Sequence, residues 1–253
     1  MTVASDWPVL ITRPAGKADQ LLASLDEMQL PYLYQPLITT QMVPLSGKAP
    51  SLLQQADGII FVSVSAVSCL QQQVDCRELT APLYAVGSTT GSLLQKCAGR
   101  EVLFPQDQRS EGLLALPALQ DVAGKHLVVV RGNAGRELIK RGLLERGAKV
   151  SYLQSYKRVP LPLDGQSLLD QWRQQQIQCI VVTSNEILQL LFQLISAEGH
   201  SWLWSRQWIM VSPRMRDAAL ELGIPEQCIF LSANANDQAL LDSICQLRGS
   251  RHV

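Results

Sequence analysis

Six short segments that each follow a predicted β-strand carry the side chains most able to do chemistry. All six are rich in serine, threonine, asparagine or glycine, and three of them contain an arginine. Hydroxyl, amide and guanidinium groups bind carboxylates and phosphates, and so do the free N–H groups at the start of a helix. The candidate substrate-binding residues in these segments are Arg13, Ser63, Ser65, Ser88, Thr89, Thr90, Arg131, Gly132, Asn133, Thr183, Ser184, Asn185, Ser212 and Arg214.

The simplest interpretation of any one of these segments is a helix N-cap, because serine, threonine and asparagine are preferred at that position. Six such segments, placed in two related halves of the chain, favour a second interpretation, which is an anion-binding surface. In an open parallel sheet, ligands bind beyond the carboxyl ends of the strands, and that is where all six segments are expected.

The sequence lacks the motifs of common nucleotide and hydrolase sites. No G-x-G-x-x-G or G-x-x-x-x-G-K-[ST] follows a predicted strand, and there is no G-x-S-x-G, which disfavours a nucleotide cofactor. No histidine lies in the six segments, and Glu186 is the acid nearest to them. Ser-His-Asp and paired-carboxylate mechanisms therefore have no candidates. An enzyme here would act by holding an anionic substrate in shape, while tyrosine or water transfers protons.

Metal binding is not expected either. The six cysteines form no C-x-x-C pair, and the three histidines are isolated from one another. We interpret the cysteines as buried, reduced thiols. A metal site would need ligands assembled from distant parts of the chain.

Short apolar runs alternate with helix-like periodicity along the chain, which is typical of a parallel α/β sheet. The runs are continuous rather than alternating, as expected for strands that helices cover on both faces. The predicted strands are Val9–Thr12, Gly58–Val62, Leu83–Val86, Glu101–Phe104, His126–Val130, Lys149–Leu153, Gln178–Val182, Gln207–Val211 and Gln227–Leu231.

Three pairs of similar blocks indicate a diverged internal duplication. Val9–Pro14 resembles Leu127–Gly132, Ile60–Ser65 resembles Val181–Asn185, and Tyr84–Ser88 resembles Ile209–Pro213. The pairs keep the same order at nearly constant separation, so we predict two related α/β halves. The joins between them are predicted in two proline-bearing segments of extended character, Pro31–Pro44 and Tyr156–Pro162.

The composition narrows the class of partner. Among 253 residues, 22 lysines and arginines balance 22 acids, and zero net charge argues against a nucleic-acid surface. No apolar run approaches the roughly 18 residues of a membrane span, and the first residues do not resemble a secretion signal. We therefore expect a soluble, cytoplasmic protein that binds neither nucleic acid nor membrane.

Seven blocks follow one another along the chain: VLITRP, IFVSVSAV, AVGSTT, RSEGLL at residues 109–114, VVRGNAGREL with its following GAKV and YKR, VVTSN, and VSPR. Their order and spacing resemble those of the uroporphyrinogen-III synthase family. The resemblance extends from Val9 to about Leu247 and so covers nearly the whole chain.

The resemblance implies an α/β fold of two flavodoxin-like parallel-sheet lobes joined by a two-stranded antiparallel linker. Carried onto this sequence, lobe one combines residues 1–35 with residues 160–253, and lobe two spans residues 42–152. The linker strands are then residues 36–41 and 153–159. These joins agree with the two proline-bearing segments.

The resemblance also implies the reaction. Linear hydroxymethylbilane is closed to uroporphyrinogen III, with loss of water and inversion of the last pyrrole ring, as a step of tetrapyrrole and haem biosynthesis. The implied enzyme needs no metal and no organic cofactor, and we expect a monomer. The eight carboxylates of the substrate suit a surface of arginines, hydroxyls and helix N-termini.

Tyr156 is the expected catalytic residue, because it matches the family's tyrosine at the end of the strand that leads back between the lobes. Its implied role is to donate a proton or a hydrogen bond to the departing hydroxyl group. The sequence departs from the family at Ser212-Pro213-Arg214, where many relatives carry Gly-Pro-Thr-Thr. Arg214 is there expected to bind a carboxylate in place of the missing hydroxyl contact.

Two other classes of function stay open at this point. Two α/β lobes with anion-binding loops also describe a small-molecule binding or sensor protein that performs no turnover. A nucleotide-dependent enzyme of Rossmann type is disfavoured by the missing glycine fingerprint. Product formation from hydroxymethylbilane separates the first alternative from the enzyme.

Overall fold

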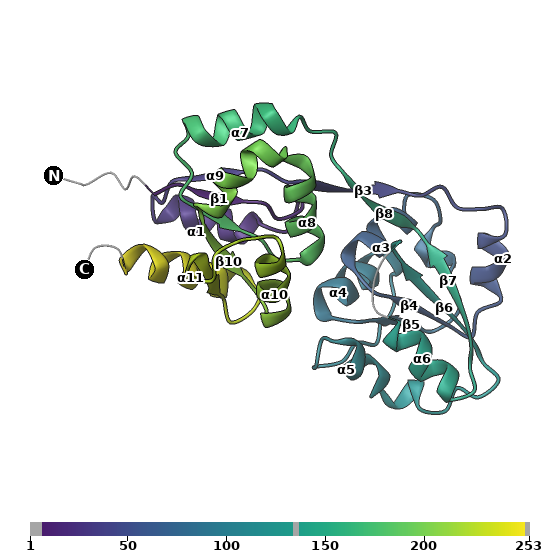
Figure 1. Cartoon of the computed structure of the whole chain (residues 1–253). Coiled ribbons are helices and arrows are strands. Elements are labelled where there is room, and N and C mark those ends of the chain that lie inside the picture. Colours follow the sequence, from purple (N-terminus) through teal and green to yellow (C-terminus); the bar gives the residue numbers. More distant parts are fainter. Residues whose placement is uncertain (1–6, 134–136, 251–253) are drawn as a thin grey trace. The chain divides into compact units, whose positions relative to one another are not determined.

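The computed structural model describes residues 7–133 and 137–250 and divides the chain into two units (Figure 1). Unit 1 combines Met1–Thr39 with Pro160–Val253, and unit 2 is Thr40–Val159. The ends of predicted lobe one, residues 1–6 and 251–253, lie outside the described residues, as do residues 134–136 of the VVRGNAGREL block.

Unit 1 contains a five-stranded parallel sheet in the order β11-β10-β9-β1-β2. Its strands are β1 (Val9–Ile11), β2 (Tyr32–Tyr34), β9 (Cys179–Val181), β10 (Gln207–Met210) and β11 (Ile229–Leu231). One face is covered by α1 (Asp19–Glu27) and α11 (Asp237–Gly249). The other is covered by α7 (Gly165–Gln174), α8 (Asn185–Leu194), α9 (His200–Trp204) and α10 (Pro213–Glu221). Short 3-10 turns lie at Ala197–Gly199 and Glu226–Cys228.

Unit 2 contains a four-stranded parallel sheet in the order β5-β4-β6-β7. Its strands are β4 (Gly58–Phe61), β5 (Leu83–Ala85), β6 (His126–Arg131) and β7 (Lys149–Gln154). Helices α2 (Ala49–Gln54), α3 (Val64–Leu70) and α4 (Ser88–Ala98) pack on one face. Helices α5 (Ser110–Leu114) and α6 (Leu138–Glu145) pack on the other. Further 3-10 turns lie at Cys76–Glu78 and Pro117–Leu119.

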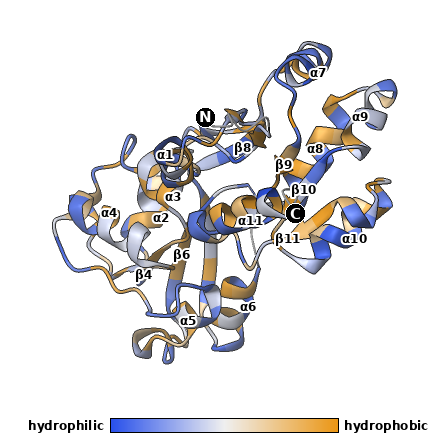
Figure 2. Ribbon diagram, turned by 90° about the vertical axis from the view of Figure 1, so that its left-hand side faces the viewer, coloured by the Kyte–Doolittle hydropathy of each residue, from blue (hydrophilic) through white to orange (hydrophobic). Residues whose placement is uncertain are grey.

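The continuous apolar strands are explained by this double cover. In β4, Ile59 and Phe61 pack with α3 and α4, whereas Ile60 between them packs with α5 and α6. Successive side chains of a strand point to opposite faces, so every position of a central strand needs an apolar residue. The middle of β6 accordingly lies in the hydrophobic part of the colour scale (Figure 2).

The three matched blocks lie on equivalent strands of the two sheets: β1 matches β6, β9 matches β4, and β10 matches β5. From the opposite edge, unit 1 has the order β2-β1-β9-β10-β11, the 2-1-3-4-5 order of flavodoxin-like sheets. The direction of strand addition reverses between β1 and β9 in unit 1 and between β6 and β4 in unit 2. Each unit therefore has its own topological switch point, where ligands of such sheets bind.

The two linking segments form a separate two-stranded sheet from β3 (Ile38–Met42) and β8 (Tyr156–Pro160). Val43 donates to the carbonyl of Ser155 at 3.0 Å and Leu161 donates to that of Leu37 at 2.9 Å. Residue numbers rise along one strand and fall along the other, as in antiparallel pairing. The predicted fold class, two flavodoxin-like parallel sheets with an antiparallel linker, is confirmed.

Two predictions about individual strands are wrong. Glu101–Phe104 is no full strand, since Leu103 alone bridges to Tyr84 at the sheet edge. Leu103 and Phe104 are 37% and 38% exposed, so this run lacks the double cover of the central strands. Tyr32–Tyr34, predicted as part of a join, is instead the edge strand β2. Pro31 and Pro36 flank this strand, and prolines are tolerated there because β2 lies at the edge of its sheet and the strand ends need fewer backbone hydrogen bonds.

All six cysteines lie in the described residues, and none of them forms a disulfide bond. Cys69, Cys76 and Cys179 are buried, as predicted, but the other three are only half-buried. Burial raises the pKa of Cys76 to about 11. Within the described residues, no helix has the length and apolar character to cross a membrane.

Candidate active site

A pocket of about 210 Å³ lies at the switch point of unit 2, at the carboxyl ends of β4 and β6. Its wall is partly apolar and partly polar, with two tyrosines and two arginines among its polar groups. The lining residues are Val62, Ser63, Val86, Ser110, Val129, Arg131, Ile139, Tyr152, Tyr156 and Arg158. The pocket thus brings together three predicted site residues, Ser63, Arg131 and Tyr156.

The phenol of Tyr156 is held at this pocket from two sides. The residue is 5% exposed, and its hydroxyl group lies 3.0 Å from Oγ of Ser63. The ring packs against Gly132, where an added Cβ would come within 2.6 Å of Tyr156 Cε2. A glycine is required there because the ring occupies the space of a side chain.

Ser63 combines a structural and a site position. It is the N-cap of α3, and its Oγ accepts the N–H of Ala66 at 3.2 Å. A serine hydroxyl has two lone pairs and one proton, so Ser63 can still exchange a hydrogen bond with Tyr156. The helix-cap interpretation of this segment is confirmed, and the same residue also lines the pocket.

Arg131 ends β6 and is buried, with 9% of its side chain exposed. Its Nη1 donates to Oε1 of Glu137 at 2.8 Å. Its guanidinium group lies over the ring of Tyr152, with Cζ 4.4 Å from the ring centre. The hydroxyl of Tyr152 donates to the second oxygen of Glu137 at 2.7 Å. These hydrogen bonds, from Tyr152 first and then Arg131, lower the pKa of Glu137. Burial, followed by the bond to Glu137, raises the pKa of Tyr152.

Asn133 has a structural use that the sequence did not indicate. Its side-chain amide pairs with the backbone of Arg158, accepting the N–H at 2.9 Å and donating to the carbonyl at 3.4 Å. This contact ties the segment after β6 to β8, the strand that carries Tyr156. Asn133 thereby helps to fix the strand beside the pocket.

The predicted residues on α3 and α4 are placed apart from the pocket lining. Ser65 is half-buried in the first turn of α3, Thr89 is exposed, and Thr90 is buried. The N–H and the hydroxyl of Ser88 both donate to Oε1 of Gln108 at 3.1 Å. Gln108 therefore caps the start of α4 in place of a ligand.

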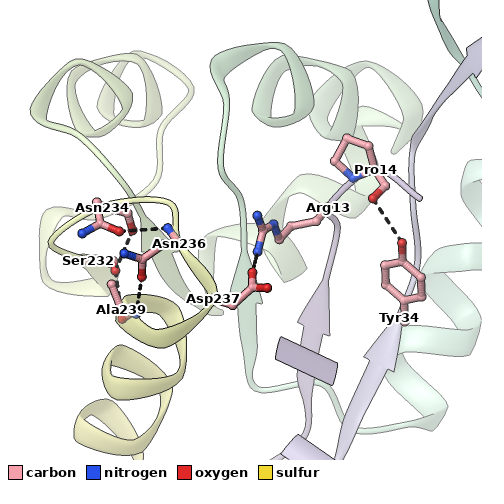
Figure 3. Close-up of polar contacts among 8 residues, drawn as sticks. All are labelled: Arg13, Pro14, Tyr34, Ser232, Asn234, Asn236, Asp237 and Ala239. Carbon is pink, nitrogen blue, oxygen red and sulfur yellow. Dashed lines mark hydrogen bonds and ion pairs between the residues drawn. The ribbon is translucent and has the colours of Figure 1, made fainter. Parts of the chain in front are cut away.

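In unit 1, Arg13 follows β1 at the switch point and pairs with Asp237 in the first turn of α11 (Figure 3). Asn236 caps the same helix by accepting the N–H of Ala239 at 2.8 Å. Arg13, which was predicted to bind substrate, is thus already paired with a carboxylate of the chain itself. Both side chains are largely buried, at 12% and 22% exposed.

The remaining predicted residues of unit 1 lie at two helix starts. Ser184 and Ser212 cap α8 and α10 by accepting the N–H groups of Ile187 and Met215, each at 3.3 Å. Thr183 is half-buried after β9, and Arg214 is exposed on α10. Oδ1 of Asn185 is buried and finds no hydrogen-bond partner among the described residues.

Sequence reasoning missed Ser110, Tyr152, Arg158 and Glu137 as neighbours of the site. For Tyr152 a signal existed, since parallel pairing of β6 and β7 places it opposite Val129, on the same face as Arg131. Glu137 had none, because its position depends on the path of the chain after β6. Within residues 7–133 and 137–250, no group of three or more histidine, cysteine, aspartate or glutamate side chains could hold a metal ion.

Comparison with known proteins gives one consistent family. The family model for uroporphyrinogen-III synthase HemD matches residues 7–241. The uroporphyrinogen-III synthases of Escherichia coli K12 and Salmonella typhimurium LT2 are each 34% identical over 245 residues, which cover 93% of this chain and 99% of theirs.

Solved structures support the fold. Uroporphyrinogen-III synthetase from Helicobacter pylori 26695 aligns with a TM-score of 0.64 at 16% identity, covering 95% of this chain and 99% of that one. A mutant uroporphyrinogen III synthase from the extremely thermophilic bacterium Thermus thermophilus aligns with a TM-score of 0.60 at 18% identity, covering 97% and 99%.

Proposed function

The chain belongs to the uroporphyrinogen-III synthase family, and from that premise we propose that the unit 2 pocket binds one end of the substrate, with Tyr156 assisting departure of its hydroxyl group. The enzyme acts in tetrapyrrole biosynthesis, where hydroxymethylbilane is cyclised with loss of water and inversion of the last ring. The observation that carries the proposal is the buried phenol of Tyr156, 3.0 Å from Ser63 and in the same pocket as Arg131.

The proposed chemistry begins with the hydroxymethyl group of the substrate. Its C–O bond breaks, the bonding electron pair leaves with oxygen, and a proton from Tyr156 converts the departing group to water. The resulting cation is delocalised onto the nitrogen of its pyrrole ring. The carbon of the last ring that already bears the bridge then attacks the cation and forms a C–C bond, which gives a spiro intermediate. The old bond from that carbon to its bridge breaks and leaves a second cation, delocalised onto the neighbouring ring. The free α-carbon of the last ring attacks this cation to form the final C–C bond, and loss of the proton from that carbon restores the aromatic ring and balances the proton given by Tyr156. General acid assistance of this kind lowers the barrier to the first step.

Ser63 supports this role through its position. If its hydroxyl donates to the oxygen of Tyr156, the phenolic proton is directed away from Ser63 and toward the pocket. Hydrogen bonds in such a chain strengthen one another. Substrate binding would therefore extend the Ser63–Tyr156 hydrogen bond into a chain of two hydrogen bonds that ends at the leaving hydroxyl group.

The volume of the pocket limits what it receives. At about 210 Å³ it is smaller than the roughly 300–1,000 Å³ of sites for drug-sized ligands. We propose that it holds one pyrrole ring with its side chains. The other carboxylates are assigned to the remaining predicted residues, which include Arg13, Thr183 and Arg214. The lobe boundaries given above, the monomeric state and the cytoplasmic location also stand as proposals.

The test of this function is turnover of hydroxymethylbilane by the purified full-length chain. After oxidation of the products, chromatography separates the inverted isomer from the uninverted ring that closes spontaneously. Rapid formation of the inverted isomer supports the proposal. Tight binding of the substrate with no acceleration of ring closure would instead make the chain a binding or sensor protein.

Replacing Thr183 with alanine is expected to have a small effect. The substrate carboxylates are shared among many donors, so loss of one hydroxyl should weaken transition-state binding by about 0.5–1.5 kcal/mol, the net worth of an ordinary hydrogen bond. The value of kcat/KM measures this loss. Thr80→Ala provides the matched control, because Thr80 is exposed. Abolished turnover in a folded Thr183→Ala protein would show that this single hydroxyl supplies most of the transition-state binding and that the donors do not share it.

Exhaustive chelation is expected to leave the rate unchanged. The scattered cysteines and histidines of the sequence motivate this expectation. The rate of ring closure before and after dialysis against a chelator is the measurement. A loss of activity that added metal restores would contradict it.

A further inference from the structure

We propose that Arg131 and Tyr152 form a binding site for one carboxylate side chain of the substrate, and that Glu137 of the chain itself occupies this site in the free protein. The inference rests on the proposed function, because it concerns the same pocket. It assigns a partner to the buried arginine and a role to two residues that the sequence did not single out.

The geometry is that of a bound carboxylate. One oxygen of Glu137 accepts from Arg131 at 2.8 Å, and the other accepts from Tyr152 at 2.7 Å. The two donors are held in place by each other, since the guanidinium group of Arg131 stacks on the ring of Tyr152. Nζ of Lys140 lies 4.9 Å from the centre of the same ring and adds positive charge.

The buried arginine of this cluster is fixed in place, whereas the exposed glutamate can be exchanged for another carboxylate. Arg131 has 9% of its side chain exposed, whereas Glu137 has 66%. Both Arg131 and Tyr152 line the pocket, and Glu137 does not. A carboxylate that enters the pocket can therefore take the place of Glu137, whose charge is then rehydrated at low cost because it already faces water.

An internal carboxylate also keeps the free protein stable. A buried guanidinium group without a counter-ion is costly, so an arginine placed for a substrate needs a substitute partner before binding. Arg13, at the equivalent position of unit 1, is likewise paired with an acid of the chain, Asp237. In unit 2, Glu137 competes with the substrate for the same donors. The net free energy of binding the substrate carboxylate is therefore its own interaction with the site minus that of Glu137.

Steady-state kinetics of Glu137→Gln test the sign of this effect. Removing the competing charge is expected to lower KM for hydroxymethylbilane by about three- to tenfold, between the worth of an exposed ion pair and that of a charged hydrogen bond. Glu145→Gln is the matched control, because Glu145 lies on α6, the helix that begins directly after Glu137, and forms an exposed ion pair with Arg141 at 3.9 Å. Its KM is expected to stay unchanged.

If Glu137 merely held Arg131 in place for the substrate, its loss would raise KM, and a raised or unchanged KM in Glu137→Gln overturns the inference. Tyr152→Phe provides a second test, because Tyr152 serves both competitors in the wild type. Its loss should raise KM at least twofold more in the Glu137→Gln background than in the wild type, and equal effects in both overturn the shared site. Absence of ring closure by the wild type would refute the proposed function instead.

Discussion

Tyr156→Phe is expected to lower kcat by about a hundredfold, the typical worth of general acid assistance. The substitution removes one oxygen from a buried ring and leaves its packing against Gly132 in place. The lost interaction is made in the transition state, so KM and the free energy of unfolding should change little. Initial rates of hydroxymethylbilane consumption over a range of concentrations give kcat and KM separately.

The isomer ratio gives a second result from the same reactions. The product should stay the inverted isomer, because the carboxylate contacts, rather than the phenol, orient the last ring. Tyr84→Phe is the matched control, since Tyr84 is equally buried, at 5% exposed, in the same unit and outside the pocket lining. An unchanged kcat would reduce Tyr156 to a packing residue. A switch to the uninverted isomer at unchanged consumption would make it a residue that steers the ring.

The sheets were predictable because their strands are buried on both faces. Such strands carry continuous apolar runs, and the runs at β1, β4, β6 and β9 stand out without knowledge of their neighbours. Half-buried edge strands give a weaker signal, since β11 was predicted from its apolar run and β2 was not. β2 consists of half-buried residues, and its assignment depends on parallel pairing with β1 rather than on its own composition.

The lining of the candidate site was predictable where position in the sheet determines which residues come together. Arg131 ends β6 and Ser63 follows the neighbouring strand β4 at a switch point, and strand order alone brings them together. Side-chain partners could not be predicted in this way. The pairing of Arg13 with Asp237 joins residues that are far apart in sequence, and Gln108 reaches Ser88 from a loop without a recognisable pattern.

The helix-cap interpretation holds for three of the six predicted segments. Ser63, Ser184 and Ser212 each accept the N–H three residues ahead, so a hydroxyl after a strand is first a local structural feature. Ser63 differs from the other two through its contact with Tyr156. A cap becomes a candidate site residue when a second group, from a distant part of the chain, converges on it.

Gly132→Ala is expected to lower kcat by about ten- to a hundredfold, because the new methyl group and the ring of Tyr156 cannot occupy the same space. The added Cβ would lie 2.6 Å from Cε2 and 2.7 Å from Cζ of that ring. Overpacking of this kind typically costs about 1–3 kcal/mol. The ring is the neighbour most able to move, so the fold should survive while the hydroxyl of Tyr156 leaves Ser63.

Gly47→Ala is the control for the substitution itself, since an added Cβ there meets nothing within 4 Å. The double variant Gly132→Ala with Tyr156→Phe identifies the path of the effect. If Gly132 acts by leaving room for the ring of Tyr156 and so fixing its hydroxyl in place, the double variant should have about the kcat of Tyr156→Phe alone. The hydroxyl whose position matters is already absent from Tyr156→Phe. Losses that multiply would mean that Gly132 contributes separately, through its own backbone contact with the substrate. A Gly132→Ala enzyme of full activity would show that the position of the phenol is not critical, and the general-acid role of Tyr156 would then fail with it.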